Sequence, residues 1–268
     1  DLDLAGVSSG AGAGNLTLTV AGALTDSAPN QAGLITINAT GQPVTLDELN
    51  DFNSVVGTAS SMTLTDVDDL NLAGVTVAGG AGPLTLTVGS LTDSTANFAG
   101  AVTLAVTGDA VLDADNDFNS LAGTAANLTV NDVDGLTLAG VNVGAGAGNL
   151  ILTVAGPLTD SAPNQAGAVT LNALGQTVVL DALNDFNSVD GVAASLTLTD
   201  TDDLDLAGVT VAGGAGPLTL TAGSLTDSAA NSAGALSLGV TGDAVLDAAN
   251  DFNTVAGTAA NLSINDID

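Results

Sequence analysis

A four-residue motif, Asn-Asp-Phe-Asn, occurs four times along the chain and shows that the sequence is built from repeats. Its phenylalanines are Phe52, Phe118, Phe186 and Phe252, and the three intervals between them are almost equal. The chain holds five phenylalanines and no other aromatic residue, so this spacing marks the duplication of a whole unit. A chain with such a long period is expected to fold as a stack of similar units.

Four repeat units follow when the chain is aligned on its Leu-x-Leu-Ala-Gly-Val pattern. They are residues 1–68, 69–134, 135–202 and 203–268, so that longer and shorter units alternate. The full period therefore comprises two units: residues 1–134 align with residues 135–268 without a gap. The last residues would lead directly into another copy of the pattern. We expect one continuous solenoid that forms part of a longer array.

Each unit contains three short runs in which apolar and polar residues alternate. In the first unit they begin near Asn15, Leu34 and Ser61. Side chains of a strand alternate between its two faces, so Leu16 and Leu18 are expected to point to the same side. Tight corners rich in Gly, Asp and Asn separate the runs. The pattern predicts an all-β protein, a parallel β-helix (β-solenoid) of about 12 coils with about 22 residues in each, three coils to a unit.

The composition excludes several classes of function. The chain has 30 acidic residues and no Lys, Arg, His or Cys, which gives a net charge of -30. Such a chain cannot neutralise phosphate, so nucleic acid is excluded as a partner. It also lacks the usual general base and any thiolate. Every acidic cluster is repeated, whereas an active site would be unique, so we do not expect an enzyme. Polar residues interrupt each apolar run, and no membrane insertion is expected.

The repeated Asn-Asp-Phe-Asn motif is interpreted as structural. A phenylalanine in the longest return of each unit is expected to fill a corner of the core, while the flanking asparagine bonds to backbone groups that leave the sheet. A ligand-binding role is the alternative. The residues assigned to this structural role are Phe52, Phe118, Phe186 and Phe252 together with Asn53, Asn119, Asn187 and Asn253.

Acidic residues gather on predicted corners at the ends of the units. Closely spaced carboxylates and corner carbonyl groups can coordinate calcium. The strict Asp-x-Asp-x-Asp-Gly pattern of calcium loops is missing, so solvated acidic corners are the other interpretation. No other cofactor is expected. The candidate calcium ligands are Asp66, Asp68, Asp69, Asp132, Asp134, Asp200, Asp202 and Asp203, with Asp266 and Asp268 as their counterparts in the last unit.

Threonine pairs are predicted to face outward from some of the strands. Thr63 and Thr65 form one such pair, and Thr85 and Thr87 form another. Flat threonine arrays are used by ice-binding solenoids, but threonine is also a common solvent-facing strand residue. A calcium-binding or ice-binding solenoid module is therefore the alternative to a purely structural protein.

Three runs carry a resemblance to a known family: NLTLTVAGALTDSA, AVTLAVTGDAVLDADNDFNS and NLTVNDVDGLTLAGV. They resemble the repeats in the passenger regions of filamentous-haemagglutinin-like and related giant bacterial adhesins, and the resemblance covers the whole chain. It implies a right-handed parallel β-helix that is secreted to the cell surface and acts as an adhesion stalk or fibre, for example in biofilms. The expected partners are the chain itself, by end-to-end coil stacking or covalent continuation, and the surface of a host or neighbouring cell.

Overall fold

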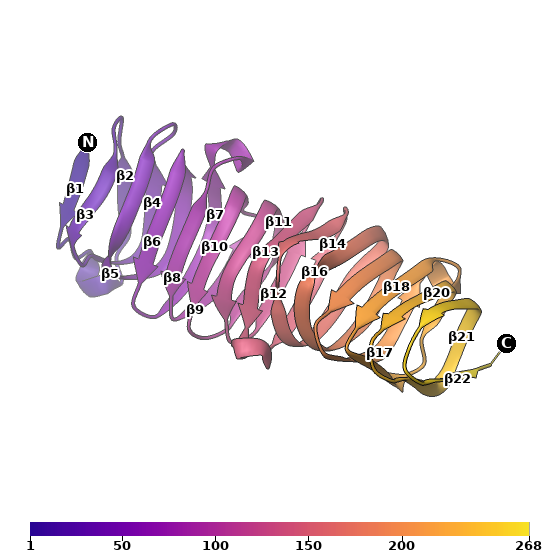
Figure 1. Cartoon of the computed structure of the whole chain (residues 1–268). Coiled ribbons are helices and arrows are strands. Elements are labelled where there is room, and N and C mark those ends of the chain that lie inside the picture. Colours follow the sequence, from indigo (N-terminus) through magenta and orange to yellow (C-terminus); the bar gives the residue numbers. More distant parts are fainter. Residues whose placement is uncertain (268) are drawn as a thin grey trace. The chain divides into compact units, whose positions relative to one another are not determined.

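The computed structural model comprises two compact units, Asp1–Asp132 and Val133–Asp268, and describes residues 1–267. Each unit is a parallel β-solenoid with almost no helix, which confirms the predicted fold class. Figure 1 shows the strands of each unit stacked one above the next. Within a unit, each turn of the chain is hydrogen-bonded to the turns before and after it.

The first unit contains twelve strands and two short helical elements. They are β1 (Leu2–Ala5), η1 (Gly10–Gly12), β2 (Leu16–Thr19), β3 (Leu24–Ala28), β4 (Gln31–Asn38), β5 (Pro43–Ala59), β6 (Ser61–Asp66), β7 (Asp69–Val77), η2 (Ala78–Gly80), β8 (Leu84–Val88), β9 (Ser90–Thr95), β10 (Phe98–Val106), β11 (Ala110–Ala125) and β12 (Leu128–Asp132).

The second unit repeats this arrangement over its described residues. Its elements are β13 (Leu136–Val143), η3 (Gly144–Gly146), β14 (Asn149–Val154), β15 (Leu158–Ala162), β16 (Gln165–Asp200), β17 (Asp203–Val211), η4 (Ala212–Gly214), β18 (Pro217–Ala222), β19 (Ser224–Ala229), β20 (Ser232–Val240), β21 (Ala244–Thr258) and β22 (Leu262–Asp266). The longest strands exceed the usual length of a strand because they continue around corners of the solenoid.

The register of the parallel strands gives the length of one turn. Successive pairings lead from Asp3 to Ala122 in six turns, so one turn takes about 20 residues. The chain makes about 14 turns in all, more than the 12 coils expected from the sequence. We expected one turn for each of the three alternating runs in a repeat. The structure instead has about 14 turns in four repeats, which is about three and a half turns in each.

Because each repeat makes about three and a half turns, equivalent residues of consecutive repeats lie on opposite sides of a unit. Thr25 and its counterpart Thr92 thus belong to different columns, because Thr25 pairs with Thr45 whereas Thr92 pairs with Asn71 and Val111. The elements η1 and η2 show the same effect and lie on opposite sides of the first unit (Figure 1). A side chain is therefore stacked against residues from a different part of the repeat, not against its own copies.

The glycine-rich segments form the four short helical elements, each of three residues. Their backbone is left-handed at the middle position, with φ of 53° at Ala11 and 64° at Gly79. The turn closes through a bond from the backbone N–H of Ala13 to the carbonyl oxygen of Gly10, at 3.2 Å. In the part of the chain that the structure describes, no helix is long and apolar enough to cross a membrane.

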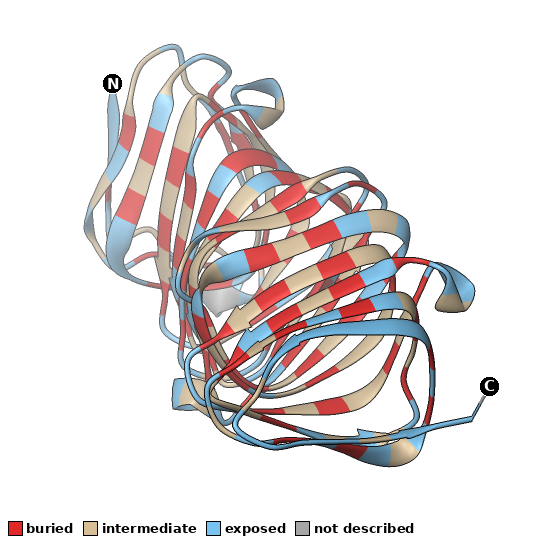
Figure 2. Cartoon of the chain, turned by 45° about the vertical axis from the view of Figure 1, so that its right-hand side comes forward, coloured by how far each residue is buried: buried red, intermediate tan, exposed pale blue. Residues whose placement is uncertain are grey.

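The core is made by side chains that alternate between inward and outward positions along the straight parts of the strands. In β6, Met62 and Leu64 are buried, while Ser61, Thr63 and Thr65 are half-exposed. Figure 2 shows this pattern as red segments that alternate with tan or blue ones along the ribbons. Each fully buried apolar side chain contributes roughly 1.5 to 3 kcal/mol, so the stacked columns of Leu and Val are the main source of stability.

One glycine in each repeat is required by close packing between turns. Gly123 has a φ of 114°, and a Cβ at this position would lie 1.9 Å from the carbonyl oxygen of Leu104 in the previous turn. Gly57 and Gly191 have the same surroundings, with the carbonyl oxygens of Ile37 and Leu171 at 2.1 and 2.0 Å. No residue with a side chain fits there without a shift of the backbone.

Candidate functional site

The most elaborate polar arrangement is a buried cluster at one corner of each repeat, which we call the asparagine corner. In the first repeat it consists of Asn30, Asn50 and Asp26. Both asparagines are fully buried. The backbone N–H and the Nδ2 of Asn30 both donate to Oδ1 of Asn50, at 2.9 and 3.0 Å. The Nδ2 of Asn50 donates to Oδ2 of Asp26 at 2.8 Å. These three side chains thus link successive turns of the solenoid.

Backbone groups complete the asparagine corner. Oδ1 of Asn30 accepts a bond from the backbone N–H of Val7 at 2.8 Å. The Nδ2 of Asn50 is also within 3.3 Å of the carbonyl oxygens of Leu46, Glu48 and Thr65. Since the amide has two N–H groups, it is shared among several acceptors. Among the described residues, every buried side-chain nitrogen and oxygen has a hydrogen-bond partner.

The asparagine corner occurs in all four repeats. Its members in the other three repeats are Asn97, Asn116 and Asp93, then Asn164, Asn184 and Asp160, and then Asn231, Asn250 and Asp227. Sequence reasoning missed this cluster. The available signal was the run Thr-Asp-Ser-x-x-Asn, which every repeat contains before its Asn-Asp-Phe-Asn motif.

A buried carboxylate lies on the next turn, beside the asparagine corner. Oδ2 of Asp66 accepts the backbone N–H of Phe52 at 2.7 Å, and Oδ1 accepts that of Asp68 at 3.2 Å. Asp66 is only 4% exposed. Burial, and secondarily the nearby Asp68 carboxylate, raises the pKa of Asp66 to about 7. Burial and the neighbouring Asp202 carboxylate likewise raise the pKa of Asp200, the counterpart in the third repeat, to about 6.

The four phenylalanines of the repeated motif are buried, as expected for side chains that fill the core. The flanking asparagines assigned to the corners, Asn53, Asn119, Asn187 and Asn253, are instead exposed. The amide that organises the corner is the first asparagine of the motif, two residues before the phenylalanine. Strand alternation explains the difference: if Phe52 points inward, Asn50 does so too and Asn53 points outward.

The candidate calcium ligands fall into two groups that differ in burial. Asp66, Asp132 and Asp200 are buried, and each bonds to the backbone N–H of the phenylalanine of its repeat. The remaining candidates within residues 1–267 are outside the core: Asp68, Asp69, Asp134, Asp202, Asp203 and Asp266. Asp268 lies outside the described residues. Over residues 1–267, the structure places no group of three or more carboxylates in an arrangement that could hold a metal ion.

Raising the pH from 5 to 8 is expected to destabilise the fold through Asp66 and Asp200. Their folded-state pKa values lie above the ordinary value of 3.8, so the folded state holds protons that the unfolded state has lost. The stability that these two groups contribute is therefore fully present below about pH 4 and is lost as the pH rises towards 7. We expect a melting temperature about 5 °C lower at pH 8 than at pH 5, measured by circular dichroism.

The control for this pH dependence removes two exposed carboxylates in place of the buried ones. The double variant D66N/D200N should flatten the pH profile, whereas D47N/D181N, which removes the same formal charge, should leave its slope unchanged. Equal slopes in the two variants would show that overall charge repulsion, and not the buried carboxylates, sets the pH dependence.

Several exposed or half-buried carboxylates outside the core are paired with neutral donors from adjacent turns. Five such bonds run from Ser27 to Asp3 at 2.7 Å, from Gln31 to Asp51 at 3.2 Å, from Asn127 to Asp109 at 2.7 Å, from Gln165 to Asp185 at 3.2 Å and from Asn261 to Asp243 at 2.7 Å. Hydroxyl and amide groups thus take the place that Lys and Arg have in most proteins. This pairing explains how a sheet with no cationic side chain accommodates its charge.

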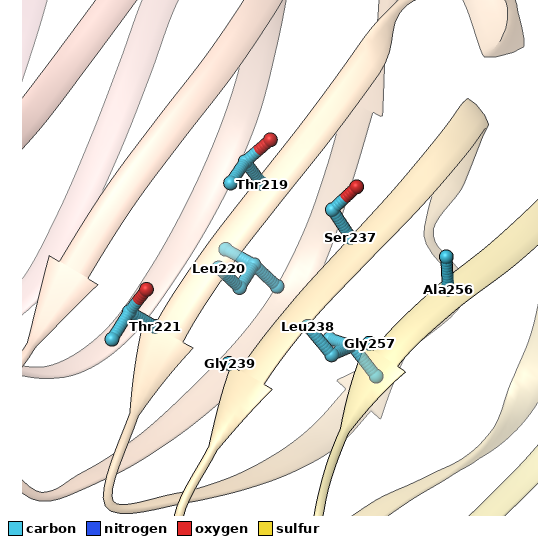
Figure 3. A pocket seen from close by; sticks show the side chains of 8 residues that line it. All are labelled: Thr219, Leu220, Thr221, Ser237, Leu238, Gly239, Ala256 and Gly257. Carbon is cyan, nitrogen blue, oxygen red and sulfur yellow. The ribbon is translucent and has the colours of Figure 1, made fainter.

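A hydroxyl-lined hollow lies on the outer face of β18, β20 and β21 in the second unit (Figure 3). Its volume is about 310 Å³, and its polar side chains are Thr219, Thr221 and Ser237. The other lining residues are Leu, Ala and Gly. This hollow offers hydrogen bonds but no titratable group, so its lining cannot supply acid or base catalysis.

Outward threonines form a ladder in the first unit. Thr25, Thr45, Thr63, Thr85 and Thr103 pair in register on five successive turns. A second row beside it contains Thr65 and Thr87, after which the next turn has Ala105. The two-row threonine array that the ice-binding alternative requires therefore ends on this side at Ala105.

Comparison with known proteins shows one similarity. A family model described as Repeats of unknown function (DUF5649) matches residues 1–59, 59–125, 125–192 and 193–259. The four matches cover most of the chain and follow one another with the period seen in the sequence. No match was found among curated proteins or among solved structures.

Proposed function

The chain belongs to this family of repeats of unknown function, and we propose that it is a structural scaffold, a stalk or fibre segment of a secreted bacterial surface protein of the adhesin type. The expected location is extracellular, at the cell surface. The proposal assigns the chain a mechanical role: it holds other parts of the protein at a distance, and it carries out no reaction.

The observation that carries this proposal is which residues recur in the four repeats. The recurring positions include the interior frame of a repeat, namely the buried phenylalanine, the asparagine corner and the glycine packed against the previous turn, besides outward members of the same motif such as Asn53. The outward position of Leu49, by contrast, differs between neighbouring repeats. The residues there are Leu49, Asp115, Leu183 and Ala249 in the four repeats. A recurring interior is what a scaffold requires, and the variation at this outward position is unlike a binding surface shared by all four repeats.

The interior suits a load-bearing element. Apolar columns, backbone ladders and buried amides all link one turn to the next, so displacement of a turn breaks several kinds of contact together. The acidic exterior keeps such a protein soluble and opposes lateral clumping. We propose that the chain extends by covalent continuation or by stacking on copies of itself, and that host or neighbouring cells are the surfaces it reaches.

The test of location and role uses intact cells of the source organism and an antibody raised against residues 1–268. Surface labelling that disappears after proteinase K treatment of intact cells, with labelled filaments in negative-stain electron microscopy, would support the proposal. Labelling that requires cell lysis and survives the protease would overturn it. A denaturing gel of the native material then distinguishes the two ways of extension. A very large polypeptide indicates covalent continuation, and small subunits indicate a non-covalent assembly.

A further inference from the structure

A groove on the first unit is lined by exposed apolar side chains that acidic residues flank in the chain. We call it the Leu49 groove, and its lining consists of Leu49, Thr65, Asp66, Val67, Thr87, Val88, Gly89, Ala105 and Thr107. Its volume is about 330 Å³. That size is at the lower end of the range for ligand pockets and suits one or two side chains of a partner.

Two exposed aliphatic side chains, together with the smaller Ala105 and the buried Val88, form the apolar part of this groove. Leu49 is 64% exposed and Val67 is 56% exposed. Their backbones are held in place, because Nδ2 of Asn50 donates to the carbonyl oxygen of Glu48 at 2.9 Å and the N–H of Val67 donates to the carbonyl oxygen of Asn50 at 2.8 Å. Leu49 and Val67 are therefore presented to solvent from a rigid support, which lowers the ordering cost of binding.

The residues that flank Leu49 and Val67 in the chain are acidic. Asp47 and Glu48 immediately precede Leu49, and Asp68 and Asp69 immediately follow Val67, and all four are exposed. Residues 1–268 contain no Lys, Arg or His to offset them. The potential at the groove is negative, so an occupant with an apolar stem and a cationic end is favoured there.

We propose that the Leu49 groove binds a lysine-rich, extended segment of another protein, with an aliphatic side chain against Leu49 and Val67 and ammonium groups beside the exposed carboxylates. A second copy of residues 1–268 cannot be this partner, because it has no cationic side chain and carries the same negative charge. This inference does not depend on the proposed scaffold role.

The repeats offer an internal comparison. Leu183, the counterpart of Leu49 in the third repeat, is 65% exposed, whereas the second and fourth repeats have Asp115 and Ala249 at this position. The leucine and valine occur together only in the first repeat, because the third repeat has Thr201 in place of Val67, while the second and fourth have Val133 and Ile267 without the leucine. Changing Leu49 and Leu183 together removes the exposed leucine from both repeats that carry it.

The test measures binding of three short labelled peptides of equal length to residues 1–268 in 150 mM NaCl by fluorescence anisotropy. One peptide alternates Lys with Leu, one alternates Lys with Ser, and one alternates Glu with Leu. We expect the Lys/Leu peptide to bind most tightly and the Glu/Leu peptide not to bind. The variant L49S/L183S should bind the Lys/Leu peptide about fivefold to tenfold more weakly than the parent chain does. Its affinity for the Lys/Ser peptide should be unchanged.

A matched control variant is L174S/V245S, which removes two exposed aliphatic side chains that neither line the groove nor correspond to Leu49 or Val67 in another repeat. It should bind all three peptides as the parent chain does. The proposal would be overturned by equal losses in the two variants, by equal losses for the Lys/Leu and Lys/Ser peptides, or by no Lys/Leu binding at this salt concentration. Unchanged melting curves of both variants exclude loss of folding as the cause.

Discussion

Replacing Asn50 by alanine is expected to lower the free energy of unfolding by about 3 to 5 kcal/mol. The substitution removes the acceptor of two bonds from Asn30 and the donor to Asp26. The fully buried Asn30 is then left without this acceptor, and the half-buried Asp26 carboxylate loses one of its donors. Urea denaturation followed by circular dichroism measures the change.

Asn53 provides the matched control for this variant because it belongs to the same motif and is exposed. Replacing Asn53 by alanine should change the free energy of unfolding by less than about 0.5 kcal/mol. If the two variants lose similar amounts of stability, the asparagine corner is not the element that holds the turns together.

Replacing Phe118 by alanine is expected to destabilise the first unit by about 3 to 5 kcal/mol. Phe118 is fully buried and pairs with Ala99 of the previous turn, so the smaller side chain leaves a cavity between stacked turns. Its backbone N–H also donates to Oδ2 of Asp132 at 2.8 Å, and a shift into the cavity would weaken that bond. Urea denaturation again measures the loss.

Phe98 is the control for this cavity, since it is the one phenylalanine outside the repeated motif and is 37% exposed. We expect Phe98→Ala to cost about 1 kcal/mol or less. A loss as large as that of Phe118→Ala would mean that the apolar area of any phenylalanine, not its place between turns, sets the stability.

The parallel solenoid could be predicted from the sequence because its causes are local and repeated. Alternation of Leu or Val with Thr predicts strands that are buried on one face, and the recurrence of residues 1–134 in residues 135–268 predicts a stack. The number of turns could not be derived in this way. The corners differ in length, and which run pairs with which depends on register, which only the folded chain reveals through pairings such as Thr63 with Thr85.

The candidate site could be predicted only in part. The buried phenylalanines followed from their regular spacing, but the asparagines chosen beside them were those that point to solvent. The essential residues Asn30 and Asp26 lie far from Asn50 along the chain and become its neighbours only when turns stack. A pattern that is read along the chain does not show which polar residues meet across it.

By itself, the sequence determined the class of fold and the presence of four repeats, because these depend on side-chain alternation and periodicity. Only the tertiary structure decided which residues share a column and which carboxylates are buried. The physical reason is the number of turns: four repeats share about 14 turns, so each repeat ends about half a turn out of phase with its start. Contacts between turns therefore join residues that the sequence keeps apart.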